Sequence, residues 1–122
     1  MAENSSNTAS GSHRSGAKRL IIMRHAEADW GLNDFDRPLT KRGHEQAAAA
    51  GAWLASRGYI PEQIMSSSAL RTRQTTTWVA DGLGSKAPTA HLDEGLYEVS
   101  AARIIARING VSENVHSLMV VS

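Results

Sequence analysis

Short apolar runs alternate along this chain with longer segments that have the residue pattern of helices. The apolar runs lie at residues 20–23 and 118–121, and shorter strand-like segments lie at 63–65 and 89–92. Between them are three segments of helical pattern, at residues 40–57, 69–81 and 100–108. Strands that alternate with helices form parallel βαβ units, in which helices cover both faces of the sheet. The pattern therefore predicts an α/β fold, a three-layer sandwich with a mostly parallel sheet flanked by helices.

The ends of the expected helices carry local signals. Thr40 is a suitable N-cap for the first helix, and Gly58 follows that helix at the position where glycine commonly ends one. Gly82 and Gly84 are expected to end the second helix. We therefore place the helix boundaries near residues 40, 57, 69 and 81.

Several apolar residues are expected in the core. Residues 20–23 are four consecutive apolar residues, two of them β-branched, and this predicts a buried strand. A second buried strand is predicted at residues 117–122. Trp53 and Trp78 lie among alanine and valine on the expected helices, and such residues usually belong to the core.

Residues 1–18 differ in composition from the rest of the chain. They are dominated by Ser, Asn, Ala and Gly and contain no aromatic residue. Such a segment cannot bury enough surface to offset the entropy lost on ordering. We expect a flexible polar tail over residues 1–18 and one folded domain over residues 19–122.

The composition also excludes several functions. The 122 residues include no cysteine, which rules out a thiol nucleophile and a thiolate metal site. With 13 basic and 12 acidic residues the net charge is +1, so the chain lacks the field on which non-specific nucleic-acid binding relies. No segment approaches the roughly 18 apolar residues of a membrane span, and no secretory signal is present. We expect a cytoplasmic protein that binds neither nucleic acid nor membrane.

Charged groups follow two of the expected strands. Arg24 and His25 come directly after the first strand, and Arg71 lies in the first turn of a helix that follows three serines, Ser66-Ser67-Ser68. Because parallel strands end at one edge of the sheet, these groups are expected to converge. A helix N-terminus and the planar fork of arginine both bind phosphate oxygens. The sequence therefore predicts a phosphate-sized anion site.

Three stretches, in this order, resemble motifs of the histidine phosphatase (phosphoglycerate mutase-like) superfamily. They are Arg24-His25-Ala26-Glu27-Ala28, then Arg37-Pro38-Leu39-Thr40-Lys41-Arg42-Gly43 with Gln46-Ala47, and Ser67-Ser68-Ala69-Leu70-Arg71-Thr72-Arg73-Gln74-Thr75. The alanine after the Arg-His pair, the Arg-Pro-Leu-Thr motif and the short length are most similar to the small SixA-type phosphohistidine phosphatases. The resemblance extends over residues 19–122 and implies the phosphoglycerate mutase-like form of the predicted α/β fold.

The resemblance implies roles for particular residues. His25 would be the nucleophile, forming a phosphohistidine intermediate that water then hydrolyses. Arg24 and Arg71 would clamp the phosphoryl oxygens as catalytic residues, and Arg37 and Ser68 would join them in binding substrate. No metal ion and no other cofactor are implied.

The proton donor has three candidates. Leu96-Tyr97-Glu98 resembles the acidic segment that follows the third strand in the family, so Glu98 is the first candidate for the general acid. Glu27 and Asp29 are the alternatives. For Glu98 the pattern fits a solvated loop carboxylate equally well, and for Glu27 and Asp29 it favours a solvated loop carboxylate over a proton donor. A phosphohistidine substrate lowers the demand for an acid, because protonated imidazole is a better leaving group than an alkoxide.

The sequence departs from the family at its end. The family has a second catalytic histidine directly after the final strand, followed by further helix and strand, whereas this chain stops at Val121-Ser122. His116 precedes that strand and would lie at the opposite edge of the sheet. We therefore expect a fold without its C-terminal part, little activity in this chain, and an uncovered, aggregation-prone final strand at residues 118–121.

Three functions compete at this stage. The first is a phosphohistidine phosphatase that acts on a phosphorylated protein, weak or inactive as this chain stands. The second is a phosphatase of the same superfamily for a small phosphate-bearing substrate. The third is a catalytically inactive domain that binds phosphate or a protein partner.

Overall fold

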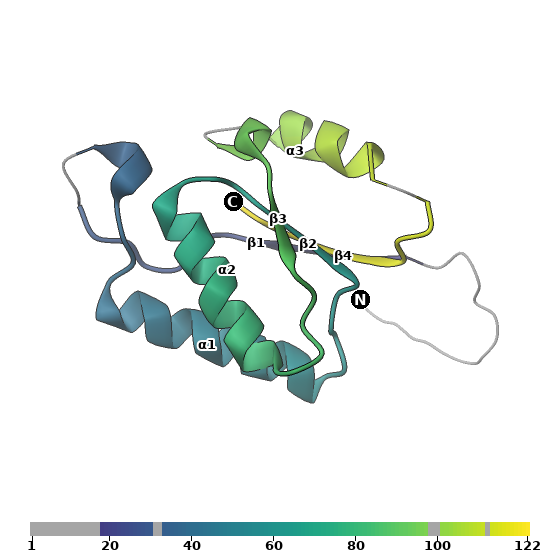
Figure 1. Ribbon diagram of the computed structural model, residues 1–122, viewed down its shortest axis with the longest axis horizontal. Coiled ribbons are helices and arrows are strands. Elements are labelled where there is room, and N and C mark those ends of the chain that lie inside the picture. Colours follow the sequence, from purple (N-terminus) through teal and green to yellow (C-terminus); the bar gives the residue numbers. More distant parts are fainter. Residues whose placement is uncertain (1–17, 31–32, 98–100, 112) are drawn as a thin grey trace.

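The computed structural model describes residues 18–30, 33–97, 101–111 and 113–122, which form a four-stranded sheet with helices on both sides (Figure 1). The strands are β1 (Arg19–Met23), β2 (Gln63–Ser66), β3 (Ala90–Leu92) and β4 (Ser117–Val121). They are all parallel and lie in the order β1-β4-β2-β3. Residues 1–17 of the predicted tail lie outside the described residues, so the tail and the domain boundary at residue 18 stay predictions.

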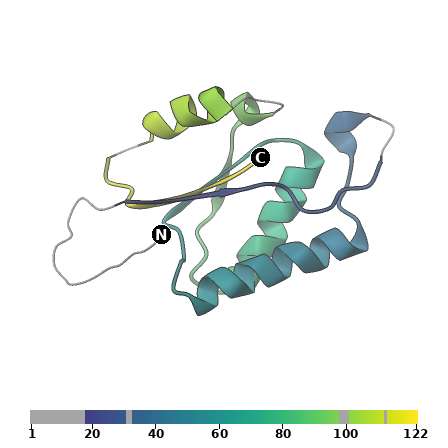
Figure 2. The ribbon, with the colours of Figure 1, turned by 180° about the vertical axis from the view of Figure 1, so that it is seen from behind.

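The helices form the two outer layers. α1 (Lys41–Ser56) and α2 (Leu70–Leu83) cover one face of the sheet, and α3 (Ala101–Asn109) lies over the other (Figures 1 and 2). Two short 3₁₀ helices, η1 (Asp34–Asp36) and η2 (Glu94–Leu96), lie in the loops. The three-layer α/β class predicted from the alternating pattern is thus confirmed. Within the described ranges, no helix combines the length and apolar composition that crossing a membrane requires.

The first helix begins and ends where its sequence signals predict. The hydroxyl of Thr40 accepts a hydrogen bond from the Gly43 N–H at 2.9 Å, as an N-cap does. Gly58, with φ of 74°, takes the left-handed conformation just after the helix. A side chain at Gly43 would collide with the backbone oxygen of Glu27, which lies 2.1 Å from the position of a Cβ atom. The close contact at Gly43 therefore brings the segment after β1 directly onto the start of α1.

The final strand is the best-buried element, which contradicts the expectation that residues 118–121 would be uncovered. β4 lies between β1 and β2, so both of its edges are paired. Met119 and Val121 pack toward α1 and α2, whereas Leu118 and Val120 belong to a second cluster with Ile104 and other residues on the α3 side. None of the four strand residues is more than 5% exposed. The position of β4 in the sheet, which the apolar run does not encode, protects it.

The first strand is less buried than its composition predicts. Leu20 is 47% exposed and Ile22 is 56% exposed, whereas Ile21 and Met23 pack against the core under α1 and α2. β1 pairs with β4 alone among the described strands, and α3 does not cover its outer residues. The prediction of a buried strand is therefore wrong for the face that carries Leu20 and Ile22, and the opposite face is partly buried.

Gly82 has a different role from the predicted one. It lies inside α2, and a Cβ atom there would come within 2.3 Å of the backbone oxygen of Ala48 on α1. Gly51 on α1 has a matching contact, 2.1 Å from the Val79 oxygen. Gly84, with φ of 92°, caps the helix. The glycines thus let α1 and α2 touch backbone to backbone, and only Gly84 ends α2.

The two tryptophans on the helices are not core residues. Trp53 is 53% exposed and Trp78 is 38% exposed. The Arg57 guanidinium lies over the Trp53 ring, and the His44 ring stacks on Trp78 with a centroid distance of 5.3 Å. Because alanines and glycines occupy the contact between α1 and α2, the wide indole rings lie at its rim.

Candidate active site

Three chain segments meet at the carboxyl ends of β1, β4 and β2. The His25 N–H donates to the Ser122 carbonyl at 2.9 Å, and the Ser122 N–H donates to Met23 at 3.0 Å. On the other side of β4, the Ser67 N–H donates to the Val121 carbonyl at 3.0 Å. His25 and the loop before α2 therefore lie at one edge of the sheet, as the parallel topology predicts. His116 precedes β4, and its carbonyl accepts from Arg19 at the opposite end of β1, also as predicted.

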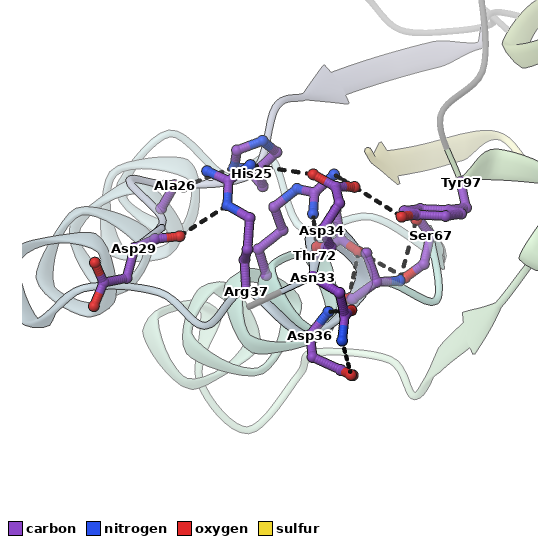
Figure 3. Close-up of polar contacts among 12 residues, drawn as sticks. His25, Ala26, Asp29, Asn33, Asp34, Asp36, Arg37, Ser67, Thr72 and Tyr97 are labelled. Atoms are coloured by element: carbon purple, nitrogen blue, oxygen red, sulfur yellow. Dashed lines mark hydrogen bonds and ion pairs between the residues drawn. The ribbon is translucent and has the colours of Figure 1, made fainter. Parts of the chain in front are cut away.

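His25 has one ring nitrogen fixed by the backbone. Its Nδ1 lies 2.8 Å from the Ala26 carbonyl, which can only accept, so Nδ1 carries the proton and Nε2 is left with a lone pair (Figure 3). Partial burial lowers the pKa of His25, the contact with Ala26 opposes this, and the positive charges of Arg71, Arg24 and Arg37 lower it further. The ring is therefore neutral at pH 7, the form that a nucleophilic imidazole requires.

A threonine fixes the histidine segment to α2. The Ala26 N–H donates to the Thr75 hydroxyl at 3.0 Å, and that hydroxyl donates to the Arg71 carbonyl at 2.7 Å. Thr75 is only 1% exposed. The sequence analysis gave Thr75 no role. A signal was present, because Thr75 lies four residues after Arg71 and therefore on the same face of the helix, where its hydroxyl can bond to a neighbouring backbone group.

Two arginines from separate segments converge on Asp34 of η1 (Figure 3). Arg71 donates from Nη1 to the Asp34 backbone oxygen at 2.7 Å and from Nη2 to Oδ2 at 3.1 Å. Arg37 donates from Nη1 to Oδ1 at 3.2 Å. The side chains of Arg71 and Arg37 are only 11% and 17% exposed. The structure thus brings together His25, Arg71 and Arg37 of the predicted set and adds Asp34.

Asp34 is held in its charged form. The Tyr97 hydroxyl, 2.7 Å from Oδ2, lowers the pKa of Asp34 most, and the hydrogen bonds from Arg71 and Arg37 act in the same direction. The Tyr97 ring meets the Phe35 ring edge-on at a centroid distance of 5.1 Å, which helps to fix the hydroxyl. Sequence reasoning missed Asp34 because it lies in a loop and its partners Arg71 and Tyr97 are distant in the chain.

The three candidate proton donors differ in their surroundings. Glu27 accepts two hydrogen bonds from Arg42, at 2.8 and 3.1 Å, and one from Thr40, and these bonds lower its pKa with Arg42 as the main cause. An ionised carboxylate in such a pair is a structural link and a poor proton donor. Asp29 accepts from the Trp30 N–H at 2.8 Å. Glu98, the first candidate, lies outside the described residues.

The remaining predicted site residues are close to this edge. Arg24 is exposed, and its charge contributes to the lowered pKa of His25. Ser68 lies in the loop between β2 and α2, half-buried, where its carbonyl accepts from Arg73 at 2.9 Å. α2 begins at Leu70 without a side-chain cap. Contacts of Arg24 and Ser68 with a substrate stay predictions.

The three motifs fall within one sequence family. The model of the histidine phosphatase superfamily (branch 1) matches residues 20–113. The chain belongs to this superfamily. The match includes the segments of this histidine phosphatase domain that carry His25, Arg37 and Arg71, and it confirms the family resemblance drawn from the motifs.

Individual relatives agree with this assignment. An uncharacterised protein of Mycobacterium tuberculosis is 39% identical over 101 residues, which are 81% of this chain and 61% of the relative. A structure assigned to the phosphohistidine phosphatase SixA of Agrobacterium tumefaciens has a TM-score of 0.77 and 30% identity, over 86% of this chain and 68% of its own. The protein histidine phosphatase SixA complexed with tungstate gives 0.76 and 28%, over 84% and 67%. The domain thus spans about three fifths to two thirds of the length of these proteins.

Proposed function

We propose that this domain belongs to a phosphatase in which His25 accepts the phosphoryl group of the substrate. The observation that carries the proposal is the state of His25: its Nδ1–H is fixed on the Ala26 carbonyl, its Nε2 keeps a lone pair, and its pKa is lowered by burial and by Arg71, Arg24 and Arg37. A neutral imidazole beside several positive charges is suited to attack an anionic phosphoryl group.

The proposed reaction has two steps. In the first, the lone pair of His25 Nε2 attacks phosphorus, the bond from phosphorus to the leaving atom breaks, and the leaving group takes up a proton. In the second, water attacks phosphorus, the bond to Nε2 breaks, and inorganic phosphate is released. Charge on the equatorial oxygens is greatest during each transfer, and Arg71, Arg37 and Arg24 stabilise it. Acidification protonates His25 and stops the first step, at a pH below the ordinary pKa of histidine because the pKa of His25 is lowered.

The substrate we favour is phosphohistidine on a protein. The similarity to SixA structures supports this choice, and so does the arrangement of carboxylates, since Glu27 is paired with Arg42 and serves poorly as an acid. Imidazole leaves phosphorus with less help from an acid than an alkoxide does. We retain Glu98 as the proposed donor where one is needed, and we retain Ser68 as a further substrate contact.

The test is transfer of labelled phosphate from a phosphohistidine peptide to the chain. His25→Ala should abolish labelling, whereas His91→Ala, on the exposed surface of β3, should leave it unchanged. Labelling of the His25→Ala variant would contradict the proposal. Labelling by a small phosphate ester but not by the peptide would instead favour a small-molecule phosphatase. Tungstate binding without transfer from either donor would favour an inactive phosphate-binding domain.

A further inference from the structure

Asp34 connects two positive side chains that the sequence places far apart. Arg71 belongs to the first turn of α2, and Arg37 lies just before α1, yet each donates to a different carboxylate oxygen of Asp34. Figure 3 shows Asp34 with Arg37 on one side and Tyr97 on the other. Asp34 therefore holds Arg71 from outside α2, and it holds Arg37 from within the same loop.

The contacts with Asp34 use only part of each guanidinium group. Arg71 engages Asp34 through Nη1 and Nη2, while its Nε is buried and has no hydrogen-bond partner among the described residues. Arg37 donates from Nε to the Asp29 carbonyl at 2.8 Å and from one N–H of Nη1 to Asp34, which leaves the second N–H of Nη1 and both N–H groups of Nη2. Guanidinium has five N–H donors, and a buried donor without a partner destabilises a protein unless a ligand satisfies it. The donors that Asp34 and Asp29 do not engage are thus the ones that we assign to a phosphoryl group.

We propose that Asp34 is a positioning residue for phosphate binding: it holds Arg71 and Arg37 by one edge of each guanidinium group, so that the Arg71 Nε and Arg37 Nη2 donors face the phosphoryl oxygens beside His25. This inference rests on the proposed function, since it assigns the binding partner of the same site. Asp34 itself touches neither the substrate nor the reacting atoms.

The surroundings of Asp34 suit this role. The Tyr97 hydroxyl donates to Oδ2 at 2.7 Å and is itself fixed by the contact with Phe35. Two arginines and a tyrosine hydroxyl thus keep the carboxylate charged and in one place, as an anchor for mobile arginine side chains requires. The opposite role, in which the Asp34 carboxylate occupies the place of the phosphoryl group and competes with it, leaves the unpartnered Arg71 Nε unexplained.

The two roles predict opposite effects on anion affinity. We compare the 122-residue chain with Asp34→Asn and with Asp36→Asn, using isothermal titration with tungstate and with inorganic phosphate. Asp36 is the matched control, because it lies on the same 3₁₀ helix and loses the same charge, but its carboxylate bonds to Asn33 and to neither arginine. Positioning predicts that Asp34→Asn raises Kd about 10-fold or more, the usual effect of losing a charged hydrogen bond, while Asp36→Asn changes it less than about twofold.

A second variant keeps the test independent of the folding of Asp34→Asn. Tyr97→Phe removes the hydroxyl on Oδ2 and leaves both arginines in place, so it should raise Kd in the same direction by a smaller factor, about threefold. In the labelling assay, Asp34→Asn should slow transfer to His25 at saturating donor, whereas a purely structural effect would lower the melting temperature without that change.

The outcomes separate this inference from the proposed function. Equal or tighter tungstate binding by a folded Asp34→Asn variant would overturn the positioning role, and labelling of the unmodified chain at His25 would still stand. A chain that neither binds tungstate nor becomes labelled would overturn both. A weaker Asp34→Asn variant beside an unchanged Asp36→Asn variant would support positioning.

Discussion

Two strands of the sheet have nearly the same apolar composition but very different surroundings. β1 contains Leu-Ile-Ile-Met over residues 20–23, and β4 contains Leu-Met-Val-Val over residues 118–121. All four of the β4 side chains are buried, whereas Leu20 and Ile22 of β1 are about half exposed. The difference arises because β4 has a paired strand on each side and helices over both faces. An apolar run thus predicts a strand but leaves its place in the sheet open.

The same difference explains where the site lies. The carboxyl end of β4 accepts hydrogen bonds from His25 on one side and from Ser67 on the other. The most buried strand therefore aligns the segments that carry the nucleophile and the α2 arginine. The stability of the sheet and the geometry of the site both depend on the residues of β4. Truncation of a β4 side chain should therefore affect both.

Met119→Ala should have the largest effect on stability. Met119 is fully buried and packs in the cluster that includes Leu54 and Val79. Removing a buried methionine side chain typically lowers the free energy of unfolding by about 2–5 kcal/mol. Urea unfolding followed by circular dichroism measures this change, and Leu20→Ala on β1 is the control, with an expected loss below about 1 kcal/mol. Equal losses for the two variants would contradict the contrast between the strands.

Most of the fold was predictable because its signals are local. Alternating apolar runs and helical segments gave all four strands and the three longer helices to within about two residues, and Thr40 and Gly58 marked the ends of α1. Strand order was not predictable in this way, since pairing of β4 with β1 joins residues about a hundred positions apart and depends on the whole topology. The predicted burial of β1 and the predicted exposure of the final strand were both wrong for that reason.

The residues of the site also fall into two groups, those that local sequence signals predict and those that depend on the tertiary structure. His25 lies just after β1, and Arg71 lies in the first turn of the helix that follows β2, so their convergence could be inferred from parallel topology, and Arg37 came from the family resemblance. Asp34 and Thr75 could not be inferred, because their roles depend on single hydrogen bonds between loop, strand end and helix. Such bonds require the loop and helix to be placed to within a few tenths of an ångström, which no sequence pattern specifies.

Gly82→Ala should have the next largest effect, and it tests the side of the sheet under α1 and α2. The new methyl group would lie 2.3 Å from the Ala48 oxygen, so the two helices must move apart. We expect a loss of about 1–3 kcal/mol, even though alanine favours helix over glycine. Thermal or urea unfolding measures it. Gly110→Ala is the matched control, because its nearest contact, with the Arg107 oxygen at 3.5 Å, is an ordinary one. An unchanged or raised stability would mean that the helices are not in backbone contact.

Ile22→Thr should have the smallest effect, and it sharpens the comparison within a single strand. Ile22 is 56% exposed on the face of β1 away from α1 and α2, while its neighbour Ile21 packs against the core on the other face. Threonine keeps the β-branched shape and the strand preference, so the substitution changes little except apolar character. We expect Ile22→Thr to change the free energy of unfolding by no more than about 0.5 kcal/mol, as at other surface positions, and Ile21→Thr to lower it by more than about 1 kcal/mol, since it places a hydroxyl group against the core. The two variants are compared by urea unfolding under the same conditions. A large loss for Ile22→Thr would mean that another part of the chain covers this face of β1 in solution, and the contrast between the edge strand and the central strand would then be smaller than the structure indicates.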